Sequence, residues 1–345
     1  MDVIDKIRKR KAVVAIIGIG YVGLPLASAI SKAGFRVIGI DTDSGRVQRV
    51  RDAISNTVGG TNISSAYTGQ SPRSLQDDEM IILRGLAEMD FSVTTEFDVL
   101  KESDVAIICV PTPLSKTKDP DLSHVVKVAD EIADRFHTGM LVVLESTTYP
   151  GSTEEVILPK LSDAKGQQRV VGRDFFLGFS PERIDPGRND WTIANTPKVV
   201  GGVTSRCLEA VESLYESVTD QVVPVSSPAV AEMAKLLENT FRATNIALVN
   251  EISLMCDRLG IDVWEVIDAA KTKPFGFMPF YPGPGLGGHC IPVDPQFLAW
   301  KLKELNYDAR FIRLATEINM EMPNHVLRKV DETLRQAGKS LVNAN

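Results

Sequence analysis

The sequence has few cysteines, and their spacing fits neither a disulfide framework nor a metal site. The four, Cys109, Cys207, Cys256 and Cys290, are far apart in a chain of 345 residues, with no CxxC pair and no histidine at zinc-ligand spacing. No metal is therefore expected. In a reducing compartment such cysteines are mostly small buried hydrophobic residues, so about three of the four are expected to pack in the core.

Basic excess, long apolar runs and an apolar signal segment are also absent. Lys and Arg number 38 against 45 Asp and Glu, and the net charge of −7 argues against a nucleic-acid partner. No stretch approaches the roughly 20 apolar residues that cross a bilayer. The charged run from Met1 to Lys11 is unlike a signal peptide. A cytoplasmic protein without a membrane partner is predicted.

What the sequence does have is an alternation of apolar strands and helices. Val13–Ile17 is a β-branched run that ends at Gly18, and a helix is predicted from Gly23 to Lys32. Helical patterns such as 125–136 alternate with further strand-like runs at 36–41, 105–110, 141–145, 176–179 and 198–200. This order predicts an α/β fold with an N-terminal Rossmann-type, doubly wound parallel sheet. Residues 55–74, rich in Gly, Ser, Thr and Asn, are predicted to form an exposed, weakly ordered loop.

The character of the chain changes after Val225. Residues 229–259 contain no Pro or Gly and place apolar side chains at helical spacing, which predicts one long helix between domains or subunits. A Gly- and Pro-rich loop at 271–295 precedes helical patterns at 296–305 and 311–335, with a break expected at Pro323. Two domains are predicted, 1–226 and a helical domain at 227–338 with the long helix at its centre.

A GxGxxG motif, Gly18, Gly20 and Gly23, lies between the first predicted strand and helix, the context that favours dinucleotide binding. Its glycines permit the turn, the approach of a pyrophosphate and close helix packing. Asp41 ends the second strand, where a carboxylate accepts both ribose hydroxyls and repels a 2′-phosphate. The predicted cofactor is therefore NAD.

Two loops, 110–113 and 145–151, directly follow predicted strands. The carboxyl ends of parallel strands line the ligand crevice of such a sheet, although a simple turn is an alternative reading of each loop. The predicted cofactor-binding residues are Gly18, Gly20, Tyr21, Val22, Gly23, Asp41, Arg46, Pro111, Thr112 and Thr147.

The long helix carries Glu232, Lys235, Asn239 and Arg242 at i, i+3, i+7 and i+10, so these residues share one face. From the residues alone, this polar face is read equally well as a solvated surface or as part of a site.

The run 282–295 is the most informative. Six of its first seven residues are Gly or Pro, which lets the backbone come close to a ligand. Cys290 follows, with His289 beside it and Asp294 four residues later, and it is a candidate nucleophile. The alternative is one more packing cysteine.

These motifs closely resemble the UDP-glucose/GDP-mannose dehydrogenase family. They occur in the family's order as GIGYVGLPLA, CVPTPL, ESTTYPGST, FSPERIDPG, AEMAKLLENTFRATNIALVNE and GPGLGGHCIPVDP, from Gly18 to beyond Asp294. TTYPGST and SPERIDPG look most like the branch that oxidises UDP-N-acetylhexosamines to uronic acids, with UDP-N-acetylglucosamine the favoured substrate.

The resemblance implies a four-electron oxidation of the sugar C6 hydroxymethyl by two NAD⁺. Asp294 and Lys235 would remove the hydroxyl proton through a water, and Cys290 would carry the aldehyde through a thiohemiacetal to a thioester. Lys235 and Asn239 would stabilise the oxyanions, and Glu182 would direct the hydrolytic water. The implied catalytic residues are Cys290, Lys235, Asn239, Asp294, Glu182 and Thr147. The implied substrate-binding residues are Glu182, Arg183, Lys235, Asn239, Arg242, Gly287 and Gly288.

The chain departs from the family pattern in two ways. The third, UDP-binding domain of the family is expected to be absent, and residues 55–74 do not resemble the helical segment that usually follows the second strand. A homodimer packed along 229–259 is predicted. Alternatives are a UDP-N-acetylmannosamine or UDP-glucose 6-dehydrogenase, a single-step enzyme of the 6-phosphogluconate dehydrogenase type, and an NAD-binding or dimerisation module without turnover.

Overall fold

The computed structural model describes residues 2–58, 73–117, 119–163, 166, 168–183, 190–288 and 290–341. Its contacts divide the chain into two compact units. The first comprises Met1–Pro113 and Asp121–Lys235, and the second Leu114–Pro120 and Leu236–Asn345. The division lies within helix α8, Pro228–Leu259, whereas the sequence prediction set the domain boundary just before this helix.

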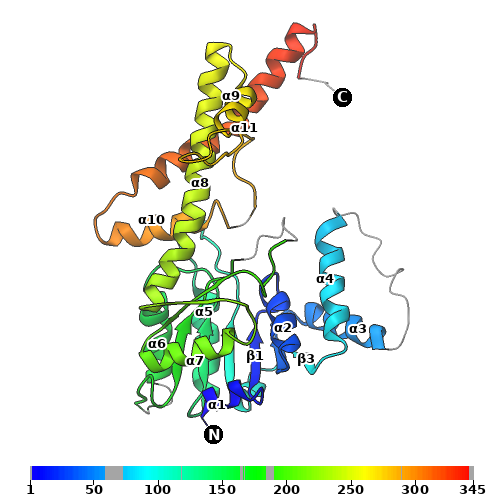
Figure 1. Cartoon of the computed structure of the whole chain (residues 1–345), viewed down its shortest axis with the longest axis vertical. Helices are drawn as coiled ribbons and strands as arrows, with labels where there is room; N and C mark the ends of the chain where they lie inside the picture. The colour runs from blue at the N-terminus through cyan, green and yellow to red at the C-terminus, as the bar shows by residue number, and fades with distance from the viewer. Residues whose placement is uncertain are drawn as a thin grey trace. The chain divides into compact units, whose positions relative to one another are not determined.

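An eight-stranded sheet in the order β3-β2-β1-β4-β5-β6-β7-β8 forms the first unit (Figure 1). All neighbouring pairs are parallel except β6 and β7. The chain passes from β1 to one side for β2 and β3 and to the other side for β4, so the strand order reverses at β1, where such sheets bind ligands. The strands are β1 Val13–Ile17, β2 Arg36–Ile40, β3 Phe91–Thr94, β4 Val105–Ile108, β5 Leu141–Leu144, β6 Phe176–Phe179, β7 Lys198–Gly202 and β8 Val222–Val225.

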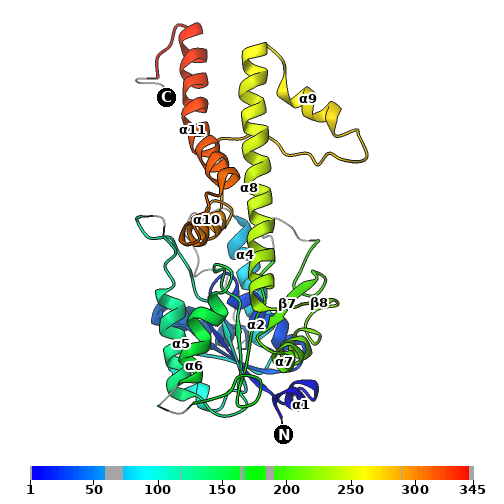
Figure 2. The same ribbon diagram turned by 90° about the vertical axis from the view of Figure 1, so that its left-hand side faces the viewer.

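Helices cover both faces of this sheet, which confirms the doubly wound α/β prediction. Figure 2 shows α5 and α6 on one face and α1 and α7 on the other. Successive residues of β1 alternate between the two cores, Val14 and Ile16 facing one and Ala15 and Ile17 the other. The helices are α1 Val3–Arg8, α2 Gly23–Lys32, α3 Ser44–Val58, α4 Arg73–Leu86, η2 Phe97–Lys101, α5 Ser123–Arg135, η3 Thr153–Ile157, α6 Leu158–Ser162 and α7 Ser205–Tyr215.

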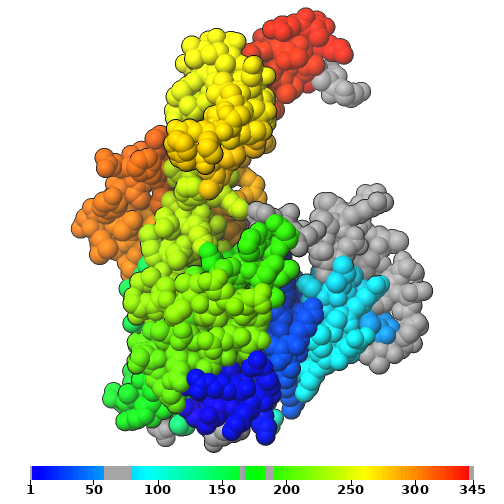
Figure 3. Space-filling view, viewed as in Figure 1, coloured from blue at the N-terminus to red at the C-terminus, as the bar shows by residue number. Residues whose placement is uncertain are grey.

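The predicted loop at 55–74 is corrected at both of its ends. Residues 55–58 are the last turn of α3, and 73–74 begin α4, while 59–72 lie outside the described residues. Apolar Val47, Val50 and Ile54 follow helical spacing and pack on the core, so the helix period continues into the polar stretch. The charged N-terminus likewise contains α1, which lies beside α7 (Figure 3).

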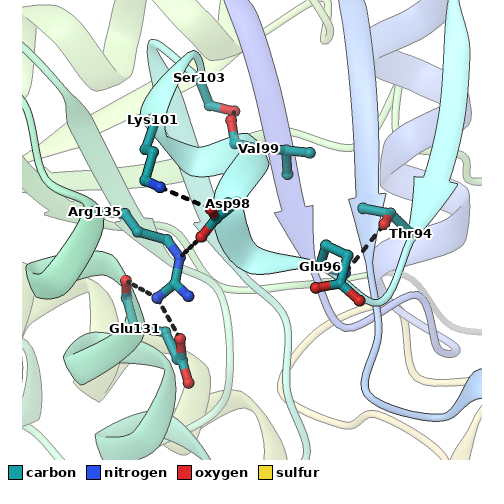
Figure 4. Close-up of polar contacts among 8 residues, drawn as sticks. All are labelled: Thr94, Glu96, Asp98, Val99, Lys101, Ser103, Glu131 and Arg135. Atoms are coloured by element: carbon teal, nitrogen blue, oxygen red, sulfur yellow. Dashed lines mark hydrogen bonds and ion pairs between the residues drawn. The ribbon is translucent and has the colours of Figure 1, made fainter.

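A polar cluster fixes the connection from β3 to β4. Figure 4 shows Asp98 of η2 accepting hydrogen bonds from Lys101 at 2.7 Å and from Arg135 of α5 at 2.8 Å. Arg135 also pairs with Glu131 at 2.5 Å. Hydrogen bonds from Lys101 and Arg135 hold the pKa of Asp98 below its usual value. These charges are satisfied by one another, so the cluster has a structural role.

The second unit is helical. It contains α8 from Leu236 onward, α9 Val263–Ala270, α10 Asp294–Glu304 and α11 Arg310–Gln336. Asn319 of α11 contacts α8 through two hydrogen bonds, accepting one from Asn250 Nδ2 at 2.9 Å and donating one to the Ala243 carbonyl at 3.1 Å. The break expected at Pro323 is wrong, since α11 continues through it. One proline removes a single hydrogen-bond donor, and the neighbouring turns and the packing on α8 retain the helix.

Candidate active site

The glycine loop after β1 has the geometry of a pyrophosphate cradle. Gly18 has a φ of +96°, and a Cβ there would lie 2.5 Å from the carbonyl oxygen of Cys109. Helix α2 begins directly after Val22 and packs close to the strand. A Cβ built on Gly23 would lie only 1.9 Å from the Gly18 carbonyl oxygen, so a side chain has no room there. Nothing lies within 4 Å of a Cβ built on Gly20, so this open space suits a bound phosphate.

Asp41 follows β2 and reaches back to the glycine loop. Its Oδ2 accepts a hydrogen bond from the Ile19 amide at 3.0 Å, and Oδ1 accepts one from the Asp43 amide at 3.0 Å. Arg46 of α3 donates to the Ile19 carbonyl at 3.0 Å. A carboxylate has about four acceptor positions, so Asp41 retains capacity for ribose hydroxyls. Tyr21 is exposed within the loop.

The structure brings together the two predicted loops that follow β4 and β5. The Thr112 hydroxyl donates to the Thr147 carbonyl at 2.7 Å. The Ser146 hydroxyl donates to the Val110 carbonyl, also at 2.7 Å. Pro111 is exposed, and Thr147 is half-buried. Both loops therefore form one connected rim at the carboxyl end of the sheet.

Glu232 on the first turns of α8 anchors the end of the second loop. It is fully buried and accepts hydrogen bonds from Gly151 N at 2.5 Å, Ser152 Oγ at 3.0 Å, and Thr153 N and Oγ1 at 3.0 and 2.6 Å. Burial raises the pKa of Glu232, while these hydrogen bonds oppose the shift. Within the polar face predicted for the long helix, Glu232 is thus a buried anchor.

The loop after β6 contacts α8 through Glu182. The Lys235 ammonium donates to the Glu182 carbonyl at 2.6 Å. Arg183 turns away from this contact and donates to the Pro197 carbonyl at 2.7 Å. Within the first unit, the structure therefore brings together two of the predicted site residues, Lys235 and Glu182.

Beneath Glu182 lies a buried charge cluster that was not predicted from the sequence. The Lys198 ammonium is 2.9 Å from Glu145 Oε2 and 3.6 Å from Glu182 Oε2. The Tyr215 hydroxyl donates to Glu145. The sequence did contain a signal for this cluster, since each of two apolar strands has a charged residue at one end. Glu145 directly follows β5, and Lys198 is the first residue of β7.

In the second unit the cysteine loop is tied to the start of α10. Cys290 is exposed, and its carbonyl accepts a hydrogen bond from the Asp294 amide at 2.8 Å. The Asp294 carboxylate is buried and accepts a hydrogen bond from Asn239 Nδ2 at 2.5 Å. Asn239 of α8 and Asp294, which follows the exposed cysteine by four residues, are thereby brought together.

The other substrate residues predicted for this unit are Gly287 and Gly288, within the cysteine loop, and Arg242 on α8. Gly288 has a φ of +82°, and Cβ atoms built on Gly287 and Gly288 meet nothing within 4 Å. Arg242 is exposed on α8. His289 lies outside the described residues. The remaining cysteines, Cys109, Cys207 and Cys256, are buried, in agreement with their predicted packing role.

A cavity of about 470 Å³ lies behind the cysteine loop within the second unit. Residues that follow Cys290 form one wall and α11 forms another. The lining is largely apolar, with hydroxyl and amide groups from Thr240, Thr244, Gln296 and Thr316. The cavity wall beside the cysteine loop is therefore built mainly from apolar side chains.

The glycine cradle, the acidic residue after β2 and the rim of loops define a dinucleotide-binding dehydrogenase, and their geometry fits NAD. Residues 12–59 and 58–219 match the NAD-binding domain, and residues 229–321 the central domain, of the UDP-glucose/GDP-mannose dehydrogenase family. The chain belongs to this family and is an NAD-dependent oxidoreductase. Among the described residues, no helix is long and apolar enough to span a membrane.

Known relatives agree with this assignment. The UDP-N-acetyl-D-glucosamine 6-dehydrogenase of Pseudomonas aeruginosa is 38% identical over 318 residues, which cover 92% of this chain and 69% of the relative. The UDP-N-acetyl-D-mannosamine dehydrogenase of Pyrococcus horikoshii is 35% identical over 326 residues, covering 94% and 72%. A solved structure of a UDP-D-ManNAc dehydrogenase from P. horikoshii superposes with a TM-score of 0.80, at 34% identity over 95% of this chain and 72% of that one.

Proposed function

We propose that the chain oxidises the C6 hydroxymethyl group of a UDP-N-acetylhexosamine to the carboxylate, with UDP-N-acetylglucosamine as the favoured substrate. The observation that carries the proposal is the exposed Cys290 thiol followed by the buried pair of Asp294 and Asn239. Single-step dehydrogenation needs no nucleophile, whereas an exposed cysteine can hold an aldehyde for a second oxidation. Relatives named for UDP-N-acetylglucosamine and UDP-N-acetylmannosamine support the substrate class.

Each proposed role follows from the chemistry of the side chain. NAD⁺, when bound over the glycine loop, supplies the hydride acceptor. Lys235 and Asp294, through a water, take the proton of the C6 hydroxyl. Lys235 and Asn239 lie four residues apart on α8, so their donors face the same side and can stabilise an oxyanion.

The remaining steps take place on Cys290. Its thiolate forms a C–S bond with the aldehyde carbon as the carbonyl π bond opens to an oxyanion, and the remaining C6 hydride would pass to a second NAD⁺, which leaves a thioester. Glu182, with Thr147 holding the water, takes a proton from water, whose oxygen bonds to the carbonyl carbon while the C–S bond breaks. Acid and thiolate are released, and the second oxidation and hydrolysis together yield the carboxylate.

The experiment that tests the proposal is a mass-spectrometric assay of the 345-residue chain with NAD⁺ and, separately, UDP-N-acetylglucosamine, UDP-N-acetylmannosamine and UDP-glucose. The expected result is acid from UDP-N-acetylglucosamine at the highest kcat/KM, with NADH and acid in a ratio of two to one. A ratio of one NADH per product, with aldehyde or ketone as the end product, would contradict the cysteine route. Faster turnover of another sugar would overturn the substrate assignment alone.

A homodimer formed along α8 is also proposed. Exposed apolar side chains recur along one stripe of the helix, on the face opposite Glu232, Lys235 and Asn239 by its 3.6-residue period. An exposed apolar stripe of this length is typical of a surface that another protein covers. A symmetric pairing of two copies would cover it in both. The stripe consists of Val230, Met233, Leu237, Phe241, Leu248, Met255 and Leu259.

A further inference from the structure

The buried cluster beneath Glu182 contains a lysine that the proposed chemistry does not use. The Lys198 and Glu145 side chains are 6% and 0% exposed, and Glu182, at 14%, is the member of the cluster that reaches toward solvent. Burying a cation between two carboxylates costs several kcal/mol of desolvation per ion and is favourable only when the geometry is good. A hydrophobic residue would fill the same space, so the retained charge calls for another explanation.

We propose that Lys198 is a positioning residue for acid release: its ammonium, 3.6 Å from Glu182 Oε2, attracts and orients the Glu182 carboxylate, and Glu145 and Tyr215 keep that ammonium in place. This inference rests on the proposed role of Glu182 as the base that activates water. An ionised carboxylate is required for that role, and a nearby cation favours the ionised form.

The contacts of Lys198 support this arrangement. Although burial works to lower it, the pKa of Lys198 is raised by the carboxylates of Glu145 and Glu182, so the ammonium stays charged. The fully buried Glu145 lies 2.9 Å from the ammonium and in turn accepts a hydrogen bond from the Tyr215 hydroxyl. Burial raises the pKa of Tyr215 well above its usual value, so this phenol remains a donor.

The surroundings of the Glu182 carboxylate determine the sign of each substitution. Glu145 repels a negative charge on Glu182, whereas Lys198 attracts it. Among the described residues, the titratable and charged groups near Glu182 are Lys198 on β7, Glu145 after β5, Cys109 after β4, Arg183 next to it and Lys235 on α8. Tyr215 on α7 contacts Glu145. Removing the cation and removing the competing carboxylate should therefore act in opposite directions on the same step.

The test compares Lys198→Met with Glu145→Gln in single-turnover experiments. NADH formation and acid release are followed separately from about pH 5 to about pH 9, so that the pH dependence of each step is obtained. For Lys198→Met we expect the rise of acid release with pH to move up by about one pH unit. For Glu145→Gln it should move down, and Lys198→Arg should restore the wild-type profile. The first NADH should form within about twofold of the wild-type rate in all three variants, because its formation does not use Glu182. A purely structural defect would slow this step as well, so the first NADH serves as the control.

A second readout does not depend on turnover. In protein labelled with ¹³C-glutamate, the Glu182 signal is identified by its loss in Glu182→Gln, and its titration midpoint should move up in Lys198→Met and down in Glu145→Gln. If Lys198→Met fails to fold, the double variant Lys198→Met/Glu145→Gln removes the buried pair together, and its midpoint should still lie above that of the wild type.

Two outcomes separate this inference from the function on which it rests. If Glu182→Gln releases acid at the wild-type rate, the proposed base is wrong and the role of Lys198 falls with it. If Glu182→Gln slows acid release but the midpoint is unchanged in both Lys198→Met and Glu145→Gln, the positioning role alone is overturned.

Discussion

Burial distinguishes four residues of one type in this chain. Cys109, Cys207 and Cys256 lie in the interior, and burial raises the pKa of the Cys109 thiol well above its usual value. Cys290 is exposed on a loop that glycines allow to approach a ligand. Because the thiolate is the nucleophile, only the exposed position suits covalent chemistry.

Replacing Cys290 tests this distinction directly. Cys290→Ser should still form the first NADH, because alcohol oxidation requires only a base and the cofactor, while acid release should fall by more than about 100-fold. Acid and NADH are quantified together by mass spectrometry and absorbance. Cys109→Ser, Cys207→Ser and Cys256→Ser are the controls and should lose stability only. Undiminished acid from Cys290→Ser would leave a single-step dehydrogenase as the better interpretation.

Asp41 has a structural role in the glycine loop, and a role in binding the cofactor is predicted for it. Asp41→Ala should weaken NAD⁺ binding by about tenfold or more, since one charged hydrogen bond contributes about 1.5–3 kcal/mol. Part of that loss comes from the glycine loop, whose Ile19 amide loses its acceptor. Calorimetric titration with NAD⁺ and NADP⁺ measures the effect. A wild-type chain that prefers NADP⁺ would contradict the role assigned to Asp41.

At the scale of elements, α8 organises the chain by presenting different residues on its two faces. One face carries the buried Glu232, Asn239 and Asn250, and the opposite face carries the exposed apolar stripe. Glu232 holds the loop after β5, and Asn250 accepts a hydrogen bond from Gly283 N at 2.9 Å at the entry to the cysteine loop. A single helix thus anchors loops in both units.

Removing the Glu232 anchor should destabilise the first unit. Glu232→Ala leaves the buried Gly151 and Thr153 amides without their acceptor, which should lower the free energy of unfolding by about 3 kcal/mol. Urea unfolding measures the loss, with Glu88→Ala, the same change at an exposed carboxylate of the first unit, as a control expected to lie within about 0.5 kcal/mol of wild type. An equal loss in both variants would refute the anchor.

The same carboxyl predicts a pH dependence. Because the pKa of Glu232 is raised in the folded chain, the unfolded state ionises first as pH rises above the ordinary value of 4.5, and the contribution of Glu232 to stability falls until the folded pKa is passed. Glu232→Gln cannot ionise, so its unfolding free energy should lack this decline. The measurement is urea unfolding of both proteins at pH values from about 4 to 8.

Elements with one strong signal could be predicted from the sequence. The apolar runs that became β1, β4 and β5 are buried on both faces, and α8 has no helix breaker, so pattern and packing agree. β3 and β8 were missed because both are edge strands of four residues, β3 with polar residues among its apolar ones and β8 with Pro224 inside its apolar run. The Glu145–Lys198 pair was missed for another reason. Its members are 53 residues apart, and only the sheet order brings them together.

For the whole molecule, the open question concerns what covers the apolar stripe of α8. Seven exposed apolar residues lie on one side of this 32-residue helix, and the second unit carries further exposed aromatic residues, among them Trp264, Phe275 and Phe311. Large exposed apolar surfaces are typical of sites that another protein covers. Pairing two copies along α8 removes this surface from water without requiring another protein.

Leu248, near the middle of the stripe and 55% exposed, is the position at which to test this pairing. Leu248→Glu keeps helix propensity but places a charge inside the expected interface, and it should weaken dimerisation by at least about 30-fold, the effect of losing a 2 kcal/mol contact. Sedimentation equilibrium at micromolar concentrations should find a dimer for the wild type and a monomer for Leu248→Glu. Val170→Glu, at a 50% exposed apolar position of the first unit, is the matched control and should stay dimeric. Since Leu248 is already exposed in one copy, thermal unfolding of the isolated monomer should be unchanged by Leu248→Glu. A wild-type chain that sediments as a monomer would contradict the dimer, and the stripe would then be a surface for a different partner.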